Sequence, residues 1–253
     1  MAKTIAAGAF LSLLCMVTNA FGSQPAREHT VADLPDWSGI WMSEDWPEGN
    51  PGRTGASHGL PLGAHLPYNA EWEARFQAMQ AALRHSHGGK SCVWYFPAVM
   101  DGPWVFEMLI TRTETAMSFE DDEIRHILTD GRSHPAPEDR WPTPWGDSVG
   151  HWEDGTLVVD TVSVAKDPSP FSPMVSESVH YAERIRMVGK NKLEDRLTIS
   201  DPAALTRPWT VTLSYIRVKN QDRIVNGDCT QNDRNPIING VEGLAPTGVN
   251  PTK

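Results

Sequence analysis

Alternating apolar and polar residues fill most of the chain after residue 92 and predict a succession of short strands. Strands are expected at residues 37–42, 93–99, 104–110, 114–119, 123–129, 148–153, 156–164, 178–188, 192–200 and 208–218. Many strands with one helix predict a mainly β protein with a single domain. We expect a single antiparallel barrel, because a closed sheet leaves no exposed edge strands.

Two strands show clear faces in the alternation. In the strand at 178–188, one face carries Val179, Tyr181, Ile185 and Met187, and the other carries His180, Arg184 and Arg186. Glu183 shares the apolar face. A carboxylate among apolar neighbours either pairs with a cation or has a raised pKa, and the second case would suit an acid–base residue.

The dipeptide Asp154-Gly155 predicts a two-residue hairpin turn, because it separates two alternating segments. The turn would pair Glu153 with Thr156, Trp152 with Leu157, His151 with Val158 and Val149 with Asp160. His151 and Asp160 would then be diagonal neighbours on one face of the hairpin, within reach of each other.

One helix is expected at residues 69–87 and should pack against the barrel. Trp72, Phe76, Met79 and Leu83 recur at helical spacing and form one apolar stripe. Asn69 can cap the start of the helix, and the glycines at 88–89 can end it. Residues 23–68 are expected to form an irregular covering segment, and residues 230–253 a tail after the barrel strands of residues 92–229.

The first 22 residues have the pattern of a signal peptide. Lys3 precedes an apolar run at 5–17, and small residues follow, with cleavage after Ala20 or Gly22. Cleavage leaves one domain, residues 23–253, and removes Lys3, so the net charge moves from −10 to −11. We therefore expect a soluble periplasmic or secreted protein that neither binds nucleic acid nor integrates into a membrane, its oligomeric state being open.

Cys92 and Cys229 are the cysteines that remain after cleavage, and we expect a disulfide bond between them because exported chains meet an oxidising compartment. Two separate buried thiols are the alternative. The bond would tie the segment after the helix to the end of the barrel strands.

The central segments resemble a large family of exported bacterial proteins. The resemblance lies in the run from Ser148 to Thr161, Ser-Val-Gly-His-Trp-Glu-Asp-Gly-Thr-Leu-Val-Val-Asp-Thr, and in residues 129–135, 176–184 and 201–210. Gly39 and Trp41 also resemble the Gly-x-Trp of the first strand in lipocalin-like barrels. The chain departs from the family pattern at Val175 and Thr230, where the family often has histidine. The resemblance implies export and a β-rich fold, which the Gly-x-Trp pattern makes a lipocalin-like (calycin-like) barrel, and it indicates no particular activity.

Neither a serine nucleophile nor a metal centre is well supported. Ser148 lies in a Gly-x-Ser-x-Gly match, but a nucleophile elbow needs a helix after the serine, and a hairpin follows here. His85 and His87 are close in sequence, but the chain has no compact metal-binding spacing. We therefore expect no cofactor, with a metal site as the lesser alternative.

The histidines and carboxylates of the strand-rich region favour acid–base catalysis. The candidate catalytic residues are His134, His151, His180, Glu183, Asp147, Asp160 and Arg184. An imidazole beside a carboxylate can move a proton near neutral pH, and Arg184 can stabilise an oxyanion. Among the ten tryptophans, aromatic residues that could line a pocket are Trp94, Trp141, Trp145 and Tyr181.

These features predict a cofactor-independent lyase or isomerase acting on a small hydrophobic or aromatic molecule in a barrel cavity, by elimination, isomerisation or retro-aldol cleavage. The first alternative is a lipocalin-like carrier that binds such a ligand without reaction. The second is a structural protein of the cell envelope, for which the barrel interior would be packed shut.

Overall fold

The computed structural model describes residues 34–44, 65–83, 93–120, 122–166 and 172–224, and the backbone of residues 237–238 and 241–242. The strands are β1 (Ile40–Ser43), β2 (Phe106–Ile110), β3 (Glu114–Phe119), β4 (Ile124–Leu128), β5 (Asp147–Glu153), β6 (Thr156–Val162), β7 (His180–Gly189), β8 (Lys192–Ser200), β9 (Trp209–Arg217), β10 (Ile237–Ile238) and β11 (Val241–Glu242). The helices are α1 (Ala70–Leu83) and the short 3-10 helices η3 (Ala98–Asp101) and η4 (Pro137–Asp139).

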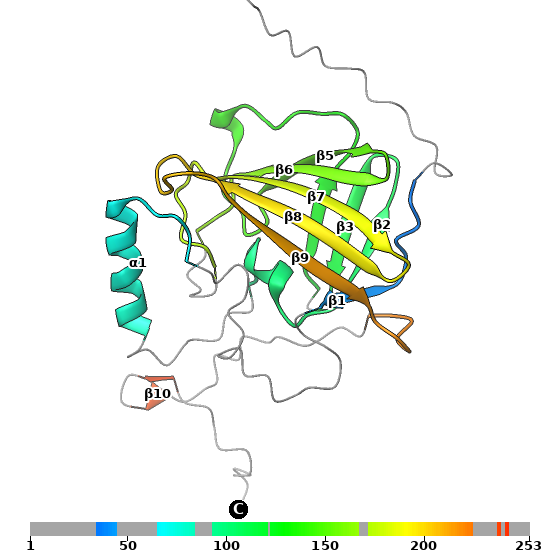
Figure 1. Ribbon diagram of the computed structural model, residues 1–253, viewed down its shortest axis with the longest axis horizontal. Coiled ribbons are helices and arrows are strands. Elements are labelled where there is room, and N and C mark those ends of the chain that lie inside the picture. The colour runs from blue at the N-terminus through cyan, green and yellow to red at the C-terminus, as the bar shows by residue number, and fades with distance from the viewer. Residues whose placement is uncertain are drawn as a thin grey trace, which may run out of the picture.

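Nine strands, β1 to β9, form one sheet that closes into a ring. The closing strand is β1, which pairs with β2 on one side and with β9 on the other. Trp41 takes part in both pairings, opposite Phe106 and opposite Arg217. In Figure 1 the ring is seen from the side, with β7, β8 and β9 in front of β2 and β3. The prediction of a mainly β fold is confirmed.

The ring contains one parallel pair, β4 with β5, which meet at Leu128 and Val149. All other neighbouring strands of the ring are antiparallel. The all-antiparallel expectation is therefore wrong at this junction, and the reason is parity. Strand directions cannot alternate all the way around a ring with an odd number of strands, so at least one neighbouring pair must be parallel.

The hairpin between β5 and β6 has the predicted register in every pair, from Glu153 with Thr156 to Val149 with Asp160. Asp154 and Gly155 both have positive φ, as a tight two-residue hairpin turn requires. The predicted faces of β7 are also confirmed, because Tyr181 and Ile185 are buried while Arg184 and Arg186 are exposed. Local alternation and turn chemistry were sufficient here because the interactions are close in sequence.

The strand expected at 93–99 does not form. Residues 93–95 have no regular structure, and the chain then turns into the 3-10 helix η3. Pro97 interrupts the segment because it has no N–H group to donate to a neighbouring strand. Phe96 instead donates its backbone N–H to the carbonyl oxygen of Pro144 at 3.0 Å and packs edge-on against Tyr181, with ring centroids 5.1 Å apart.

Helix α1 begins as predicted, at a cap formed by Asn69. The side-chain oxygen of Asn69 accepts a hydrogen bond from the backbone N–H of Trp72 at 3.1 Å. The Asn69 amide also donates to the carbonyl oxygen of Ala203 at 2.7 Å, which ties the helix start to the segment before β9. Trp72 and Phe76 pack against the main core, and Figure 1 shows α1 beside the closed sheet. The predicted end at 88–89 lies outside the described residues.

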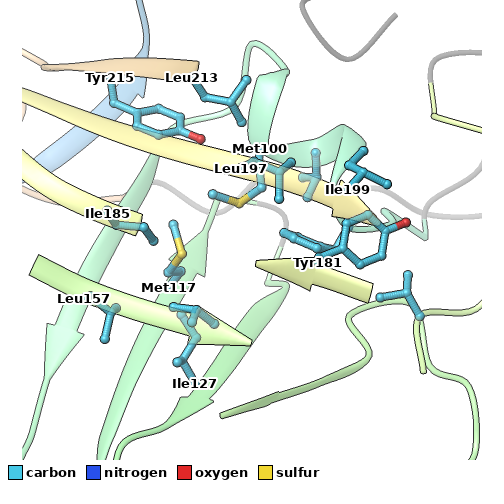
Figure 2. Packing of buried hydrophobic residues seen from close by; sticks show 14 of the residues in the cluster. Met100, Met117, Ile127, Leu157, Tyr181, Ile185, Leu197, Ile199, Leu213 and Tyr215 are labelled. Atoms are coloured by element: carbon cyan, nitrogen blue, oxygen red, sulfur yellow. The ribbon is translucent and has the colours of Figure 1, made fainter. Parts of the chain in front are cut away.

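Buried apolar side chains occupy the inside of the ring. Those labelled in Figure 2 come from η3 and six strands: Met100, Met117, Ile127, Leu157, Tyr181, Ile185, Leu197, Ile199, Leu213 and Tyr215. Each strand places every second residue on this inner face, as the pleat requires. The inner face also carries buried charged residues, among them Arg125, Glu183 and Asp195.

Gly146 precedes β5 in a left-handed conformation, with φ of +69°. A Cβ atom at this position would lie 2.5 Å from the carbonyl oxygen of Val162 and 2.7 Å from Cγ2 of Val164. We expect Gly146→Ala to lower the free energy of unfolding by at least about 1–2 kcal/mol, from the left-handed backbone alone.

Gly155→Ala is the matched control for Gly146→Ala, measured by chemical denaturation. Gly155 also has positive φ, +77°, but a Cβ atom there would meet nothing within 4 Å. The difference between the two variants therefore isolates the steric contact at Gly146. Equal losses of stability would contradict the prediction.

Candidate functional site

Four of the predicted catalytic residues meet on the outer face of the ring. His134 contacts the carboxylate of Asp147 through Nδ1, and its Nε2 lies 3.5 Å from Oδ2 of Asp160. His180 contacts Oδ1 of the same Asp160 through Nε2. We call Asp147, His134, Asp160 and His180, in this order of contacts, the outer His–Asp chain.

Strand register explains how three of these residues meet. Asp160 of β6 pairs with Ala182 of β7, and Asp147 of β5 pairs with Val162. Asp147 and His180 are therefore both diagonal neighbours of Asp160 on the same face of the sheet, where such neighbours are in reach of each other. His134 comes from the connection between β4 and β5, residues 129–146, which brings the imidazole over this face.

The two histidines of the outer His–Asp chain differ in exposure. The side chain of His134 is only 12% exposed, whereas that of His180 is 44% exposed. Nε2 of His180 lies against the carboxylate of Asp160. An imidazole in this position can accept or donate a proton at its other ring nitrogen.

His151 and Arg184 belong to a second outer group, centred on Glu153. Glu153 accepts from His151 at 2.8 Å and from Arg184 at 2.9 Å. These hydrogen bonds, with the positive charge of Arg184, lower the pKa of the Glu153 carboxyl group below its usual value. His151 is on the predicted face, but its contact is with Glu153 and not with Asp160. The structure therefore separates His151 and Arg184 from the outer His–Asp chain.

Glu183 lies on the inner face and is fully buried. Its two carboxylate oxygens accept hydrogen bonds from Arg125, at 2.9 Å from Nη1 and 2.5 Å from Nη2. Glu183 cannot join the histidines, because residues an odd number of positions apart in a strand point to opposite faces. Of the two possibilities that the sequence left open for this carboxylate, the structure shows the pairing with a cation.

Arg125 connects Glu183 to a wider set of buried polar residues. Its Nη2 also donates to Oγ1 of Thr161 at 3.1 Å and to Oγ of Ser148 at 3.4 Å, and its guanidinium lies 4.1 Å from the ring centre of Phe96. We call Arg125, Ser148, Thr161, Glu183, Asp195 and Tyr215 the inner polar cluster. Ser148 is therefore a buried hydrogen-bonding residue of β5.

Sequence reasoning missed Arg125 and Asp195. Asp195 alternates in β8 with Leu193, Leu197 and Ile199, which are all buried, and Arg125 shares its face of β4 with the buried Ile127. The same argument that singled out Glu183 would have found Asp195. In β4 the signal is weaker, because the strand is short and offers one buried apolar neighbour on that face.

The four predicted pocket aromatics have separate surroundings. Tyr181 packs in the core against Phe96, and Trp94 contacts Trp104 with ring centroids 3.9 Å apart. Trp145 packs against Phe119 and donates its Nε1–H to Glu123 at 2.8 Å. Trp141 is 75% exposed. Trp141 lies in the same connection as His134, and it is the one of the four whose ring is mainly open to solvent.

Several predicted features lie outside the described residues, namely Cys92 and Cys229 with their expected disulfide bond, the signal peptide, and His85 and His87. Among the described residues, no group of three or more histidine, cysteine or acidic side chains is arranged to hold a metal ion. In the same part of the chain, no helix is long and apolar enough to cross a membrane.

Comparison with known proteins identifies no family for this chain. No family model matches the sequence, and no curated protein is significantly similar to it. The functional argument therefore begins with the geometry of the outer His–Asp chain and the inner polar cluster.

Proposed function

We propose that this protein is a cofactor-independent enzyme that uses acid–base chemistry at the outer His–Asp chain. One observation carries the proposal: four residues singled out for proton transfer, from β5, β6, β7 and a long connection, meet in one continuous line of contacts. In this proposal His180 exchanges a proton with the substrate, because it is the accessible end of the chain.

The other members of the chain act as positioning residues. Asp160 orients the imidazole of His180 and stabilises it when it is protonated. His134 lies between the two carboxylates, with Nδ1 against Asp147 and Nε2 3.5 Å from Oδ2 of Asp160. Proton abstraction by His180 would support elimination, isomerisation or retro-aldol cleavage, the reaction types that need no cofactor.

A small hydrophobic or aromatic substrate is proposed because an exposed indole lies in the connection that carries His134. Buried side chains occupy the inner face of the ring, so the site of reaction is proposed on the outer face. Trp141, in the connection that carries His134, offers an indole that is 75% exposed. A hydrogen bond of 2.6 Å from Nε of Arg140 to the carbonyl oxygen of Pro135 holds the intervening segment. An indole held on such a segment can stack with an aromatic ring.

We also propose the type of barrel and the cellular location of the protein. The closed nine-stranded sheet supports a lipocalin-like barrel, although its one parallel pair is a departure from an up-and-down arrangement. Export to the periplasm or the medium, the Cys92–Cys229 disulfide bond and membership of the exported bacterial family are proposed from the sequence patterns alone.

The experiment is a turnover assay with small aromatic β-hydroxy carbonyl and β-aryl ether compounds, analysed by chromatography. We expect His180→Ala to lower kcat by about 10²–10⁴-fold, the usual contribution of general acid–base catalysis. Asp160→Asn is also expected to lower kcat. His151→Ala is the matched control, because its partner is Glu153, and it should retain wild-type turnover. Unchanged turnover in His180→Ala would refute the proposal.

An envelope structural protein is the second candidate, and the apolar packing inside the ring favours it. It predicts that the wild-type protein turns over none of the compounds, and that His180→Ala and Asp160→Asn are as stable and as well exported as the wild type. The same set of variants therefore separates the two functions.

A further inference from the structure

The inner polar cluster contains two buried carboxyl groups and one cation. Arg125, Glu183 and Asp195 each have 0% exposure. Register places the acids next to each other, because Asp195 of β8 pairs with Ile185, two residues after Glu183 in β7. Glu183 and Asp195 are therefore diagonal neighbours on the inner face, at a spacing that lets their side chains meet.

The guanidinium of Arg125 is directed at one acid only. Its Nη atoms donate to Glu183, Ser148 and Thr161. Neither oxygen of Asp195 accepts a hydrogen bond from an N–H or O–H group of the described residues. A buried ionised carboxylate without donors is strongly disfavoured, since burial removes the water that would solvate its charge.

A single proton removes the net charge and gives Asp195 a hydrogen bond. With both acids ionised, the three groups carry a net charge of −1 in a place without solvent. With one proton on the acids the net charge is zero, and Asp195 can donate that proton to Glu183. Carboxyl pairs that share a site hold a proton for the same reason.

We propose that Asp195 and Glu183 share one proton at neutral pH, and that release of this proton at alkaline pH loosens the closed sheet. The inner polar cluster is then a proton-binding site and a pH-sensitive switch, independent of the proposed chemistry at the outer face.

The charged and titratable groups that face Asp195 support this assignment. Burial raises the pKa of the Asp195 carboxyl group well above its usual value, and the charge of Glu183 and a hydrogen bond to it raise this pKa further, while Arg125 opposes them. Burial also raises the pKa of the Tyr215 phenol, and the charges of Asp195 and Asp101 add to this effect. Tyr215 therefore stays neutral and adds no negative charge beside Asp195.

The sign of the pH effect follows from the raised pKa. The stabilisation is complete below the pKa of Asp195 in the unfolded chain, about 3.9. Above that pH the unfolded chain loses this proton while the folded protein keeps it, so stability falls as pH rises toward the folded pKa. In that window the unfolding equilibrium constant should rise by about tenfold per pH unit from this group.

The test compares the wild type with Asp195→Asn, in which a neutral amide replaces the protonated acid. Infrared spectroscopy at pH 7 should show the carbonyl stretch of a protonated carboxylic acid in the wild type, and this absorption should be missing in Asp195→Asn. Denaturation at a series of pH values should show that the unfolding equilibrium constant of the variant lacks the tenfold rise per pH unit. Asp139→Asn, at an exposed position of η4, is the matched control and should behave as the wild type does.

Two results would overturn the proposal: the absence of a protonated-acid absorption in the wild type at pH 7, or the same pH dependence of unfolding in the wild type and Asp195→Asn. If Asp195→Asn does not fold, carbon-13 NMR of labelled aspartate carboxyl groups in the wild type gives the answer. An Asp195 carboxyl group that is ionised at pH 7 would also overturn the proposal. Turnover at the outer face does not enter into any of these measurements.

Discussion

Replacing Arg125 with methionine is expected to lower the free energy of unfolding by about 3–5 kcal/mol, the usual cost of removing one partner of a buried ion pair. Methionine fills much of the same space, so the loss comes from electrostatics more than from a cavity. Without Arg125, Glu183 loses its guanidinium donor on both oxygens. Ser148 and Thr161 keep only their hydrogen bond to each other, at 2.8 Å.

A double variant separates the charge effect from packing. Adding Glu183→Gln to Arg125→Met removes the uncompensated charge, so we expect the double variant to be more stable than Arg125→Met alone. Chemical denaturation of the two single variants and the double variant measures the coupling between the two residues. Losses that simply add would show that Arg125 and Glu183 do not stabilise each other.

Replacing Trp41 with alanine is expected to cost a similar amount, about 3–5 kcal/mol. Trp41 is fully buried, donates its Nε1–H to the carbonyl oxygen of Trp37 at 2.9 Å, and lies 4.4 Å from the guanidinium carbon of Arg217. It also belongs to β1, the short strand that closes the ring between β2 and β9. The substitution removes packing at the point where the ring closes.

Trp141→Ala is the matched control for Trp41→Ala. Trp141 is 75% exposed, and its loss should change the free energy of unfolding by no more than about 0.5 kcal/mol. Thermal and chemical denaturation of the two variants provide the comparison. A large loss in Trp141→Ala, or a negligible one in Trp41→Ala, would contradict the burial on which both expectations depend.

Much of the fold was predictable because its strongest signals are local. The turn at Asp154-Gly155 set the register of β5 and β6 in full, and Asn69 marked the start of α1. The strand predicted at 93–99 was wrong. The apolar residues of this segment resemble a strand, but Pro97 has no N–H group to donate to a neighbouring strand. The parallel pair was not visible, because it depends on the number of strands in the ring and not on a nearby residue pattern.

The candidate site was predictable in its members and not in its grouping. Alternation already placed His180 and Glu183 on opposite faces, so they could not act together. Asp160 and His180 meet through the pairing of β6 with β7, two strands separated in sequence by residues 163–179. The position of His134 over Asp147 depends on the path of a connection without regular pattern, and no propensity predicts such a path.

The parallel pair has a consequence for the architecture of the outer face. Parallel neighbours cannot be joined by a tight turn and need a crossover of a dozen or more residues. In this protein the crossover is residues 129–146, the connection that delivers His134 to Asp147 and Asp160. A version redesigned with an even number of strands could use hairpins throughout, and it would then have no segment to carry a histidine there. The odd number of strands therefore accounts for the long connection that places His134 on the outer face of the sheet.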